Sequence, residues 1–187
     1  MGKRQRKNIK IKNTSQPKVS VKSQTPNTKV GDTLTFDLSY ENWMNGIQIK
    51  GFTNKLRDIE QHSQYTYEIF NKIIPNVHKN WKIIKRQKGQ GQFRHCHILE
   101  GEEKEKAIKI AEAIHKKTIL DEETDFNIWQ FGLTNSIRIV AVYDHNNDIA
   151  YPIFLDYHHL IYPNVKYNQS DYAKYDFCPH LEHGIKF

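Results

Sequence analysis

The chain has 187 residues, of which 37% are hydrophobic and 12% aromatic, so it can bury the core of a single domain. It contains no run of 18 apolar residues, which predicts that nothing spans a membrane, and its charged N-terminus lacks the apolar block of a signal peptide. We therefore expect a cytoplasmic protein, and its two cysteines, Cys96 and Cys178, exclude a disulfide framework.

The net charge of +7 is concentrated at the N-terminus. Residues 1–31 hold nine Lys or Arg and no acid, whereas residues 32–187 hold the other 19 basic residues and all 21 acidic ones. Because residues 1–31 are also polar and poor in apolar side chains, we expect a disordered basic arm followed by one folded domain, residues 32–187. Such an arm can hold phosphate backbones or merely keep the protein soluble, so a claim of nucleic-acid binding by the domain must rest on local patches.

The first half of the domain is predicted to be largely helical. Thr33–Leu38 alternates like a short strand, and Ser39–Met44 could begin a helix. Ile47–Lys50 is a turn or a short strand. The apolar positions of Phe52–Ile74 keep helical spacing, continuous or with a break near residues 62–63, and Pro75 is expected to end that helix. Residues 77–84 then fit either a short helix or a strand.

The next stretch is strongly basic. Residues 82–94 carry two glycines, which indicate a mobile loop, and five cations. Those cations are Lys82, Lys85, Arg86, Lys88 and Arg94. They form either an ordinary solvated loop or a clamp on the backbone of RNA.

Three further elements precede the C-terminal hairpin. Residues 93–99 alternate like a strand, which would place His95 and His97 on one face and Cys96 on the other. Glu102–Lys117 has an apolar stripe, acids in its first turn and lysines at its end, which predicts a helix. Residues 126–133 are expected to form a strand that leads into the hairpin.

The hairpin, residues 136–163, carries the residues best suited to chemistry. Two apolar strands, residues 137–143 and 149–155, flank a turn, with Arg138 at one end and the sequence Asp-Tyr-His-His, residues 156–159, at the other. The order of elements predicts an α+β fold in which an antiparallel sheet packs against two or three helices and ends in a β-meander.

This hairpin resembles the C-terminal half of RelE/ParE-type toxins, in which an arginine opens the first strand, a basic pair follows the second and a tyrosine comes shortly after. The matching positions are Arg138, the pair His158 and His159, and Tyr162. The resemblance implies cleavage of messenger RNA in the ribosome without a metal, and an antitoxin partner. The chain departs from the family in its greater length, in Pro152 within the second strand, and in having histidines where lysine or arginine is common.

Cleavage of RNA needs a base for the 2′-hydroxyl, an acid for the leaving 5′-oxygen and a cation for the phosphate oxygens. His158 or His159 suits either proton role, and adjacent residues on a strand point apart, so one of the two would enter the site. Arg138 offers bidentate donors to a phosphate. Tyr162 or Tyr157 would position the substrate, and His95 and His97 could join the site if their strand is adjacent.

Two other classes of function stay open. His95, His97, Cys178 and His180 are zinc-type ligands, and the histidines with Asp156 could hold Mn or Fe in a metal-dependent phosphodiesterase. The third possibility is a non-catalytic nucleic-acid-binding or regulatory protein whose binding depends on the basic arm. Motifs for nucleotide binding and for serine hydrolases are absent from the sequence.

Overall fold

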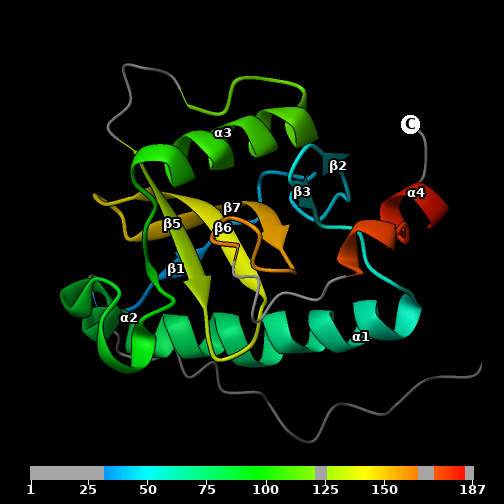
Figure 1. The fold of residues 1–187 in the computed structure, drawn as a ribbon. Helices are drawn as coiled ribbons and strands as arrows, with labels where there is room; N and C mark the ends of the chain where they lie inside the picture. The colour runs from blue at the N-terminus through cyan, green and yellow to red at the C-terminus, as the bar shows by residue number, and fades with distance from the viewer. Residues whose placement is uncertain (1–31, 121–125, 164–170, 184–187) are drawn as a thin grey trace, which may run out of the picture.

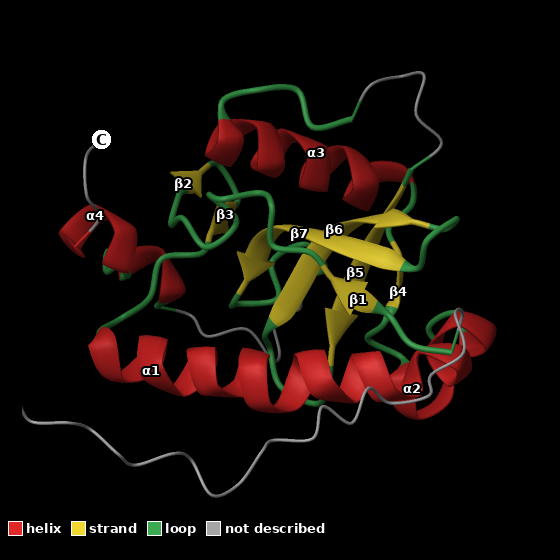
Figure 2. Cartoon of the chain, turned by 180° about the vertical axis from the view of Figure 1, so that it is seen from behind, coloured by secondary structure: helices red, strands yellow, loops and turns green. Residues whose placement is uncertain are grey.

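The computed structural model describes residues 32–120, 126–163 and 171–183. In this part of the chain a five-stranded sheet lies between a long helix on one face and a shorter helix on the other, as the two opposite views in Figures 1 and 2 show. The predicted α+β class is confirmed, with helices on both faces of the sheet. The predicted arm, residues 1–31, lies outside the described residues.

The sheet has the strand order β1-β7-β6-β5-β4. Its strands are β1 (Thr35–Phe36), β4 (His97–Ile98), β5 (Asn127–Gly132), β6 (Arg138–Asp144) and β7 (Ile149–Asp156). β5, β6 and β7 form the predicted antiparallel meander, β4 pairs antiparallel with β5, and β1 adds a parallel edge to β7. A separate hairpin consists of β2 (Gln48–Ile49) and β3 (Phe52–Thr53).

One long helical segment covers the first face of the sheet. It consists of α1 (Ile59–Glu68), the π-helical turn η1 (Ile69–Ile73) and α2 (Ile74–Gln87). The Asp58 side chain caps its start by accepting a hydrogen bond from the backbone N–H of Gln61 at 2.8 Å. The segment therefore starts later than the sequence indicated, and it has no break near residues 62–63.

The expectation that Pro75 ends the helix is wrong. The backbone N–H of Ile74 donates to the carbonyl of Ile69, five residues back, so the ladder has already left the α-helical pattern where the proline enters. A proline near the start of α2 also has no N–H to leave unpaired. The apolar side chains of Val77, Trp81 and Ile84 then keep α2 bound to the sheet.

Three other local expectations are corrected. Residues 41–44 form turns and no helix. Residues 82–87 belong to α2, so the predicted mobile loop starts only at Lys88, whose left-handed backbone (φ 46°) ends the helix. The expected strand over residues 93–99 is reduced to the two residues of β4, preceded by a 3-10 turn, η2 (Gly91–Phe93).

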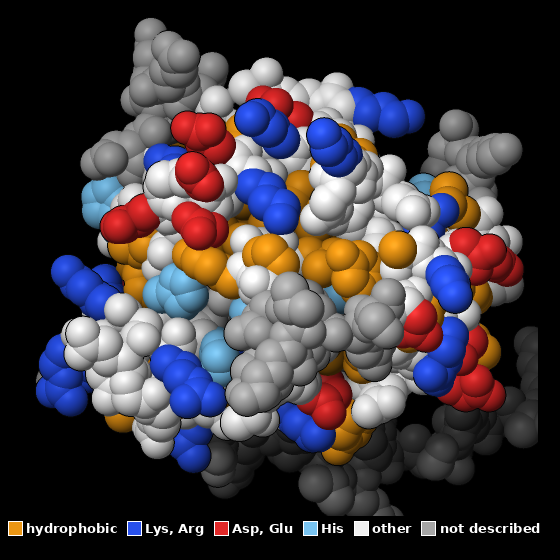
Figure 3. Space-filling view, in the orientation of Figure 1, with side chains coloured by type: hydrophobic (Ala, Val, Ile, Leu, Met, Phe, Trp, Pro, Cys, Tyr) orange, Lys and Arg blue, Asp and Glu red, His pale blue; other side chains and the backbone are white. Residues whose placement is uncertain are grey.

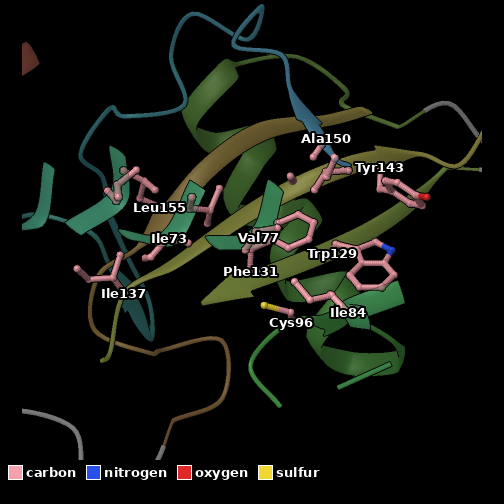
Figure 4. Packing of buried hydrophobic residues seen from close by; sticks show 14 of the residues in the cluster. Ile73, Val77, Ile84, Cys96, Trp129, Phe131, Ile137, Tyr143, Ala150 and Leu155 are labelled. Carbon is pink, nitrogen blue, oxygen red and sulfur yellow. The ribbon is translucent and has the colours of Figure 1, made fainter. Parts of the chain in front are cut away.

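The core has two parts, one on each side of the sheet. Trp129, Phe131 and Ile139 pack against Trp81 and the long helix, and Figure 4 shows several of these side chains from close by. On the other face, alternate residues such as Ile128 and Val140 pack against α3 (Gly101–His115), where the predicted helix is confirmed. The described C-terminal residues add η3 (Tyr172–Lys174) and α4 (Pro179–His183).

Within the residues that the structure describes, no helix is both long and apolar enough to cross a lipid bilayer.

Candidate functional site

Arg138 is the first residue of β6 and is almost fully buried, with 2% of its surface exposed. Strand alternation points its side chain to the α3 side of the sheet, because its neighbour Ile139 packs on the opposite side. The arginine lies across Gly132, its register partner on β5. A Cβ atom at Gly132 would lie 2.5 Å from Cδ of Arg138, so the arginine can take this path only over a glycine.

The guanidinium of Arg138 is held through Nη1, and its Nε–Nη2 edge is buried with no carboxylate partner among the described residues. Nη1 donates to the backbone carbonyls of Asn135 and Ile137, the latter at 2.8 Å. Nη2 lies 3.2 Å from Nδ1 of His95, and Nε is buried without a hydrogen-bond partner among the described residues. Nε and Nη2 together form the edge with which arginine binds a phosphate or carboxylate in a bidentate manner.

Asp156 is the nearest compensating charge and lies opposite Arg138 in the register of β6 and β7. Its carboxylate is fully buried and accepts hydrogen bonds at 2.8–3.2 Å from three backbone N–H groups, those of His158, Leu160 and Ile161. It therefore fixes the turn that follows β7. Burial lowers the pKa of Arg138 to about 10 and the charge of Asp156 opposes that shift, so the arginine is a cation at neutral pH.

Three partly exposed histidines and a tyrosine form a chain of ring contacts that begins at Arg138, with His95 in direct contact with the guanidinium. The rings of His95 and His159 are 6.3 Å apart between centroids, and the ring of His159 is 6.4 Å from that of Tyr162. The ring of Tyr162 also contacts that of His97, with centroids 5.5 Å apart. We call these five residues the histidine–arginine cluster. Figure 3 shows histidine side chains gathered on this face beside hydrophobic ones.

The environment keeps the imidazoles of His95 and His159 neutral. Burial, the Arg138 guanidinium and then Arg94 lower the pKa of His95 to about 4. Burial, followed by Arg138, also lowers the pKa of His159, although the charge of Asp156 and hydrogen bonds to the backbone oppose the shift. The phenol of Tyr162 is affected in the opposite sense, because burial and the acids Glu103 and Glu100 raise its pKa. At neutral pH the cluster thus combines neutral bases, one phenolic acid and one fixed cation.

His97 serves to position other groups. Its Nδ1 lies 3.0 Å from the carbonyl of Ile98, which can only accept, so we assign the proton to Nδ1. Nε2 then accepts the 3.4 Å contact from Nε2 of Gln130, the residue opposite it on β5. Both ring nitrogens of His97 are thus occupied, and its ring packs edge-to-face with that of Tyr162 at an interplanar angle of 62°.

Two of the predicted site residues lie away from the cluster. His158 is buried, with Nε2 2.8 Å from the carbonyl of Lys55 and its ring stacked on Tyr172 at 5.8 Å. Tyr157 is also buried, 5.5 Å from the ring of Tyr65, and burial raises its pKa. The left-handed backbone of His159 (φ 58°) directs this one histidine of the pair to Arg138.

The five predicted RNA-binding cations are spread over two places. Lys82 pairs with Asp32 at 3.1 Å, and Lys85 pairs with Asp148 at 2.8 Å, at the turn end of the β6–β7 hairpin. Arg86 and Lys88 are exposed at the end of α2. Arg94 alone touches the cluster, through Nε at 3.2 Å from Nε2 of His95.

The residues proposed as metal ligands do not assemble in the described part of the chain, where no group of three or more His, Cys, Asp or Glu could hold a metal ion. Cys178 is buried and accepts a hydrogen bond from the backbone N–H of Gly46 at 3.1 Å. His180 is exposed on α4. Cys96 is buried on the long-helix side of the sheet, and burial raises the pKa of its thiol to about 11, so it stays protonated.

The sequence alone did not indicate the importance of three residues in or beside the cluster. His95 was expected only as an addition, whereas it is the side chain in direct contact with Arg138. Gly132 and Gln130 were not considered. A glycine inside a strand otherwise rich in large apolar residues is a signal of close approach by another group, and it could have identified Gly132.

The described fold has no match among solved structures. Residues 39–184 match the protein family described as "Uncharacterised protein UU032". A similar protein of that name from Ureaplasma parvum serovar 3 is 32% identical over 171 residues, which cover 91% of this chain and 93% of the relative. The match includes the hairpin, the long helix and the whole histidine–arginine cluster, and the chain therefore belongs to the UU032 family.

Proposed function

We propose that the protein is an RNA-binding endoribonuclease that needs no metal and cleaves at the histidine–arginine cluster. One observation carries the proposal. The buried guanidinium of Arg138 turns its bidentate edge toward partly exposed histidines, and no carboxylate of the described residues is hydrogen-bonded to it. A buried cation next to titratable groups is suited to stabilising the charge on a phosphate while those groups transfer protons.

Arg138 would bind the non-bridging oxygens of the scissile phosphate. Nδ1 of His95 now occupies a position, 3.2 Å from Nη2, that a phosphate oxygen would take. A bound phosphate would also offset the charges of Arg138 and Arg94, which together with burial lower the pKa of His95. A neutral imidazole has one acceptor nitrogen, so His95 cannot accept hydrogen bonds from both Arg138 and Arg94, whereas a phosphate oxygen would form a charge-assisted hydrogen bond with Arg138.

His159 and Tyr162 would carry the protons. A neutral ring nitrogen of His159 takes the proton of the 2′-hydroxyl as the 2′-oxygen attacks phosphorus. The bond from phosphorus to the 5′-oxygen then breaks, and the phenol of Tyr162 protonates that leaving oxygen. The rings of His159 and Tyr162 are neighbours, with centroids 6.4 Å apart, so both groups could act on one bound phosphate. The products are a 2′,3′-cyclic phosphate and a free 5′-hydroxyl.

The resemblance of the hairpin to RelE/ParE-type toxins supports this assignment, because Arg138, one histidine of the pair and Tyr162 occupy the positions that match the family pattern. It extends the proposal to a cytoplasmic setting in which messenger RNA, on the ribosome, is the substrate and an antitoxin protein is the natural inhibitor.

The test is cleavage of a labelled RNA by the purified full-length chain in the presence of EDTA. Arg138→Lys and His159→Gln should each lower the cleavage rate by about 10²- to 10³-fold. His145→Gln, a change of an exposed histidine in the β6–β7 turn, should leave the rate unchanged. Products should end in a cyclic phosphate, and RNA with a 2′-deoxy residue at the cleaved position should resist.

Equal rates for wild type, Arg138→Lys and His159→Gln would overturn the proposal, and so would cleavage of the 2′-deoxy substrate. Activity that disappears with EDTA and returns with a stoichiometric metal would favour the metal-dependent alternative.

A further inference from the structure

The second half of the long helix carries only positive charge. From Ile69 to Lys88 it has six Lys or Arg and no Asp or Glu. The near-neutral charge of the domain as a whole conceals this local concentration. A one-signed helix face of this kind raises the local positive potential and attracts a polyanion.

The structure divides these cations into neutralised and available ones. Lys72 pairs with Glu68 at 3.0 Å, Lys82 with Asp32 and Lys85 with Asp148. Lys79, Arg86 and Lys88 are exposed, and no carboxylate of the described residues lies within ion-pairing distance of any of them. The two available cations within α2, Lys79 and Arg86, are seven residues apart, so they lie on the same side of the helix at a separation of about 10 Å.

Hollows flank both available cations. One of about 430 Å³ is lined by Lys79 together with Asn76, Asn80 and Leu133. The other, of about 360 Å³, is lined by Arg86 together with Lys82 and Lys85. The amide of Asn80 is held by hydrogen bonds of 2.8 and 2.9 Å to Asn76, so the polar wall of the first hollow is preorganised.

The same helix ends at the histidine–arginine cluster. Lys88 ends α2, and the following Gly89 lies so close to His97 that a Cβ atom there would be 2.8 Å from Cβ of His97. The next cation along the chain, Arg94, contacts His95. A strand of RNA on the helix face would therefore reach the cluster without crossing an acidic surface of α2.

We propose that the face of α2 that carries Lys79 and Arg86 binds the phosphate backbone of the RNA strand outside the position of cleavage. The assignment of RNA as the polyanion rests on the proposed function, while the binding itself does not require cleavage. An acidic protein surface is the competing occupant, and the spacing of Lys79 and Arg86 along one helix face, each beside a hollow, favours the regular phosphates of a nucleic acid.

The experiment measures the affinity of the full-length chain for a fluorescent 2′-O-methyl RNA, which binds but cannot be cleaved, by anisotropy over a series of salt concentrations. Lys79→Gln/Arg86→Gln should weaken binding by about tenfold near 0.1 M salt and lower the slope of log K against log salt by about 1.4. The matched control is Lys50→Gln/Lys109→Gln, which removes the same charge from exposed positions on the β2–β3 turn and α3 and should have little effect.

Identical affinities and salt slopes for the two double variants would overturn the proposal, as would equally effective competition by poly-glutamate of the same charge. Because this RNA is not cleaved, the two proposals can fail separately. If the helix variant loses binding but the wild type cleaves no RNA, the nuclease proposal is refuted and the binding surface is supported. If a short RNA is cleaved normally but the helix substitutions do not change binding, the binding surface is refuted and the nuclease proposal is supported.

Discussion

At the scale of residues, the cluster depends on Arg138 being held in place without a carboxylate against its Nε–Nη2 edge. Two carbonyls fix Nη1, Asp156 supplies charge compensation across the strand pair, and Gly132 leaves the path clear. A buried arginine that is merely structural would be expected to place its bidentate edge on a carboxylate, because an unpaired buried donor costs free energy. Arg138 leaves Nε without a partner among the described residues.

Gly132→Ala tests this arrangement. The new Cβ would lie 2.5 Å from Cδ of Arg138, so the arginine must move, and the free energy of unfolding should fall by about 1–3 kcal/mol. Activity on RNA should fall more than stability does, by about 10²-fold, since the phosphate-binding edge is displaced. In Gly132→Ala/Arg138→Ala the clash is absent, and the two stability losses, measured by chemical denaturation, should not add. Additive losses would contradict the contact.

The neutral histidines predict how stability depends on pH. His95 has a folded pKa of about 4 against an ordinary 6.5, so the unfolded state binds a proton below pH 6.5 that the folded state refuses until about pH 4. The free energy of unfolding therefore falls as the pH drops through that window, and the lowered pKa of His159 acts in the same sense. Melting temperatures of His95→Gln should fall less steeply between pH 6.5 and 4.5 than those of wild type or His145→Gln. Parallel curves would show that His95 titrates normally.

At the scale of elements, local patterns predicted α3 and the meander because each satisfies its own periodicity: an apolar stripe in one case, and apolar strands of the right length in the other. The long helix was mispredicted at Pro75 and over residues 82–87, where basic and glycine-adjacent residues suggested a loop. Tertiary packing decided the outcome, since Trp81 and Ile84 are fully buried against the sheet and hold the basic residues of α2 in helical geometry.

Asp148 connects α2 to the turn end of the hairpin. One of its oxygens accepts hydrogen bonds from Trp81 Nε1 and Lys85 Nζ at 2.8 Å and from the hydroxyl of Tyr143 at 2.5 Å. Although burial raises the pKa of Asp148, these donors together lower it. The Asp148 carboxylate thus joins α2 to the β6–β7 hairpin through the buried Trp81 and Tyr143 and the half-exposed Lys85.

Asp148→Asn removes the charge but keeps a residue that tolerates the left-handed backbone found there (φ 52°). We expect a loss of about 1–3 kcal/mol in the free energy of unfolding, because the buried donors lose a charged acceptor. Lys85→Gln should cost less, since that side chain is about half exposed and a surface ion pair contributes little. Urea denaturation of both variants checks the order, and a larger loss for Lys85→Gln would contradict it.

At the scale of the whole molecule, the sequence predicted which residue types are suited to chemistry better than it predicted where they meet. Arg138, His159 and Tyr162 belong to one hairpin, so local reasoning brought them together, but it could not decide which histidine of the pair joins the cluster. That choice depends on the backbone of the turn that Asp156 organises. His97 lies on β4, at the edge of the sheet, and His95 lies just before that strand. Their approach to Arg138 depends on the strand order, which periodicity does not encode.

The positive charge of the molecule is concentrated in two places, residues 1–31 and the exposed face of α2. On the proposed function, the nine cations of residues 1–31 and the available cations of α2 would both bind RNA, and α2 holds the latter in a defined position relative to the histidine–arginine cluster. The first group should therefore contribute to the capture of RNA and the second to its placement for cleavage.

Removal of residues 1–31 separates the two contributions. The shortened chain should bind RNA more weakly, by about 10-fold or more at 0.1 M salt, and with a shallower salt dependence, because several phosphate contacts are lost. Its single-turnover cleavage rate at saturating enzyme should stay within about twofold of wild type, since the cluster and α2 lie outside the deleted stretch. Lys79→Gln/Arg86→Gln should instead lower the single-turnover rate even at saturation, because RNA that is bound but misplaced reacts slowly. A shortened chain that binds RNA normally would show that the arm has no part in capture, and one that loses its chemical step would show that the arm belongs to the site.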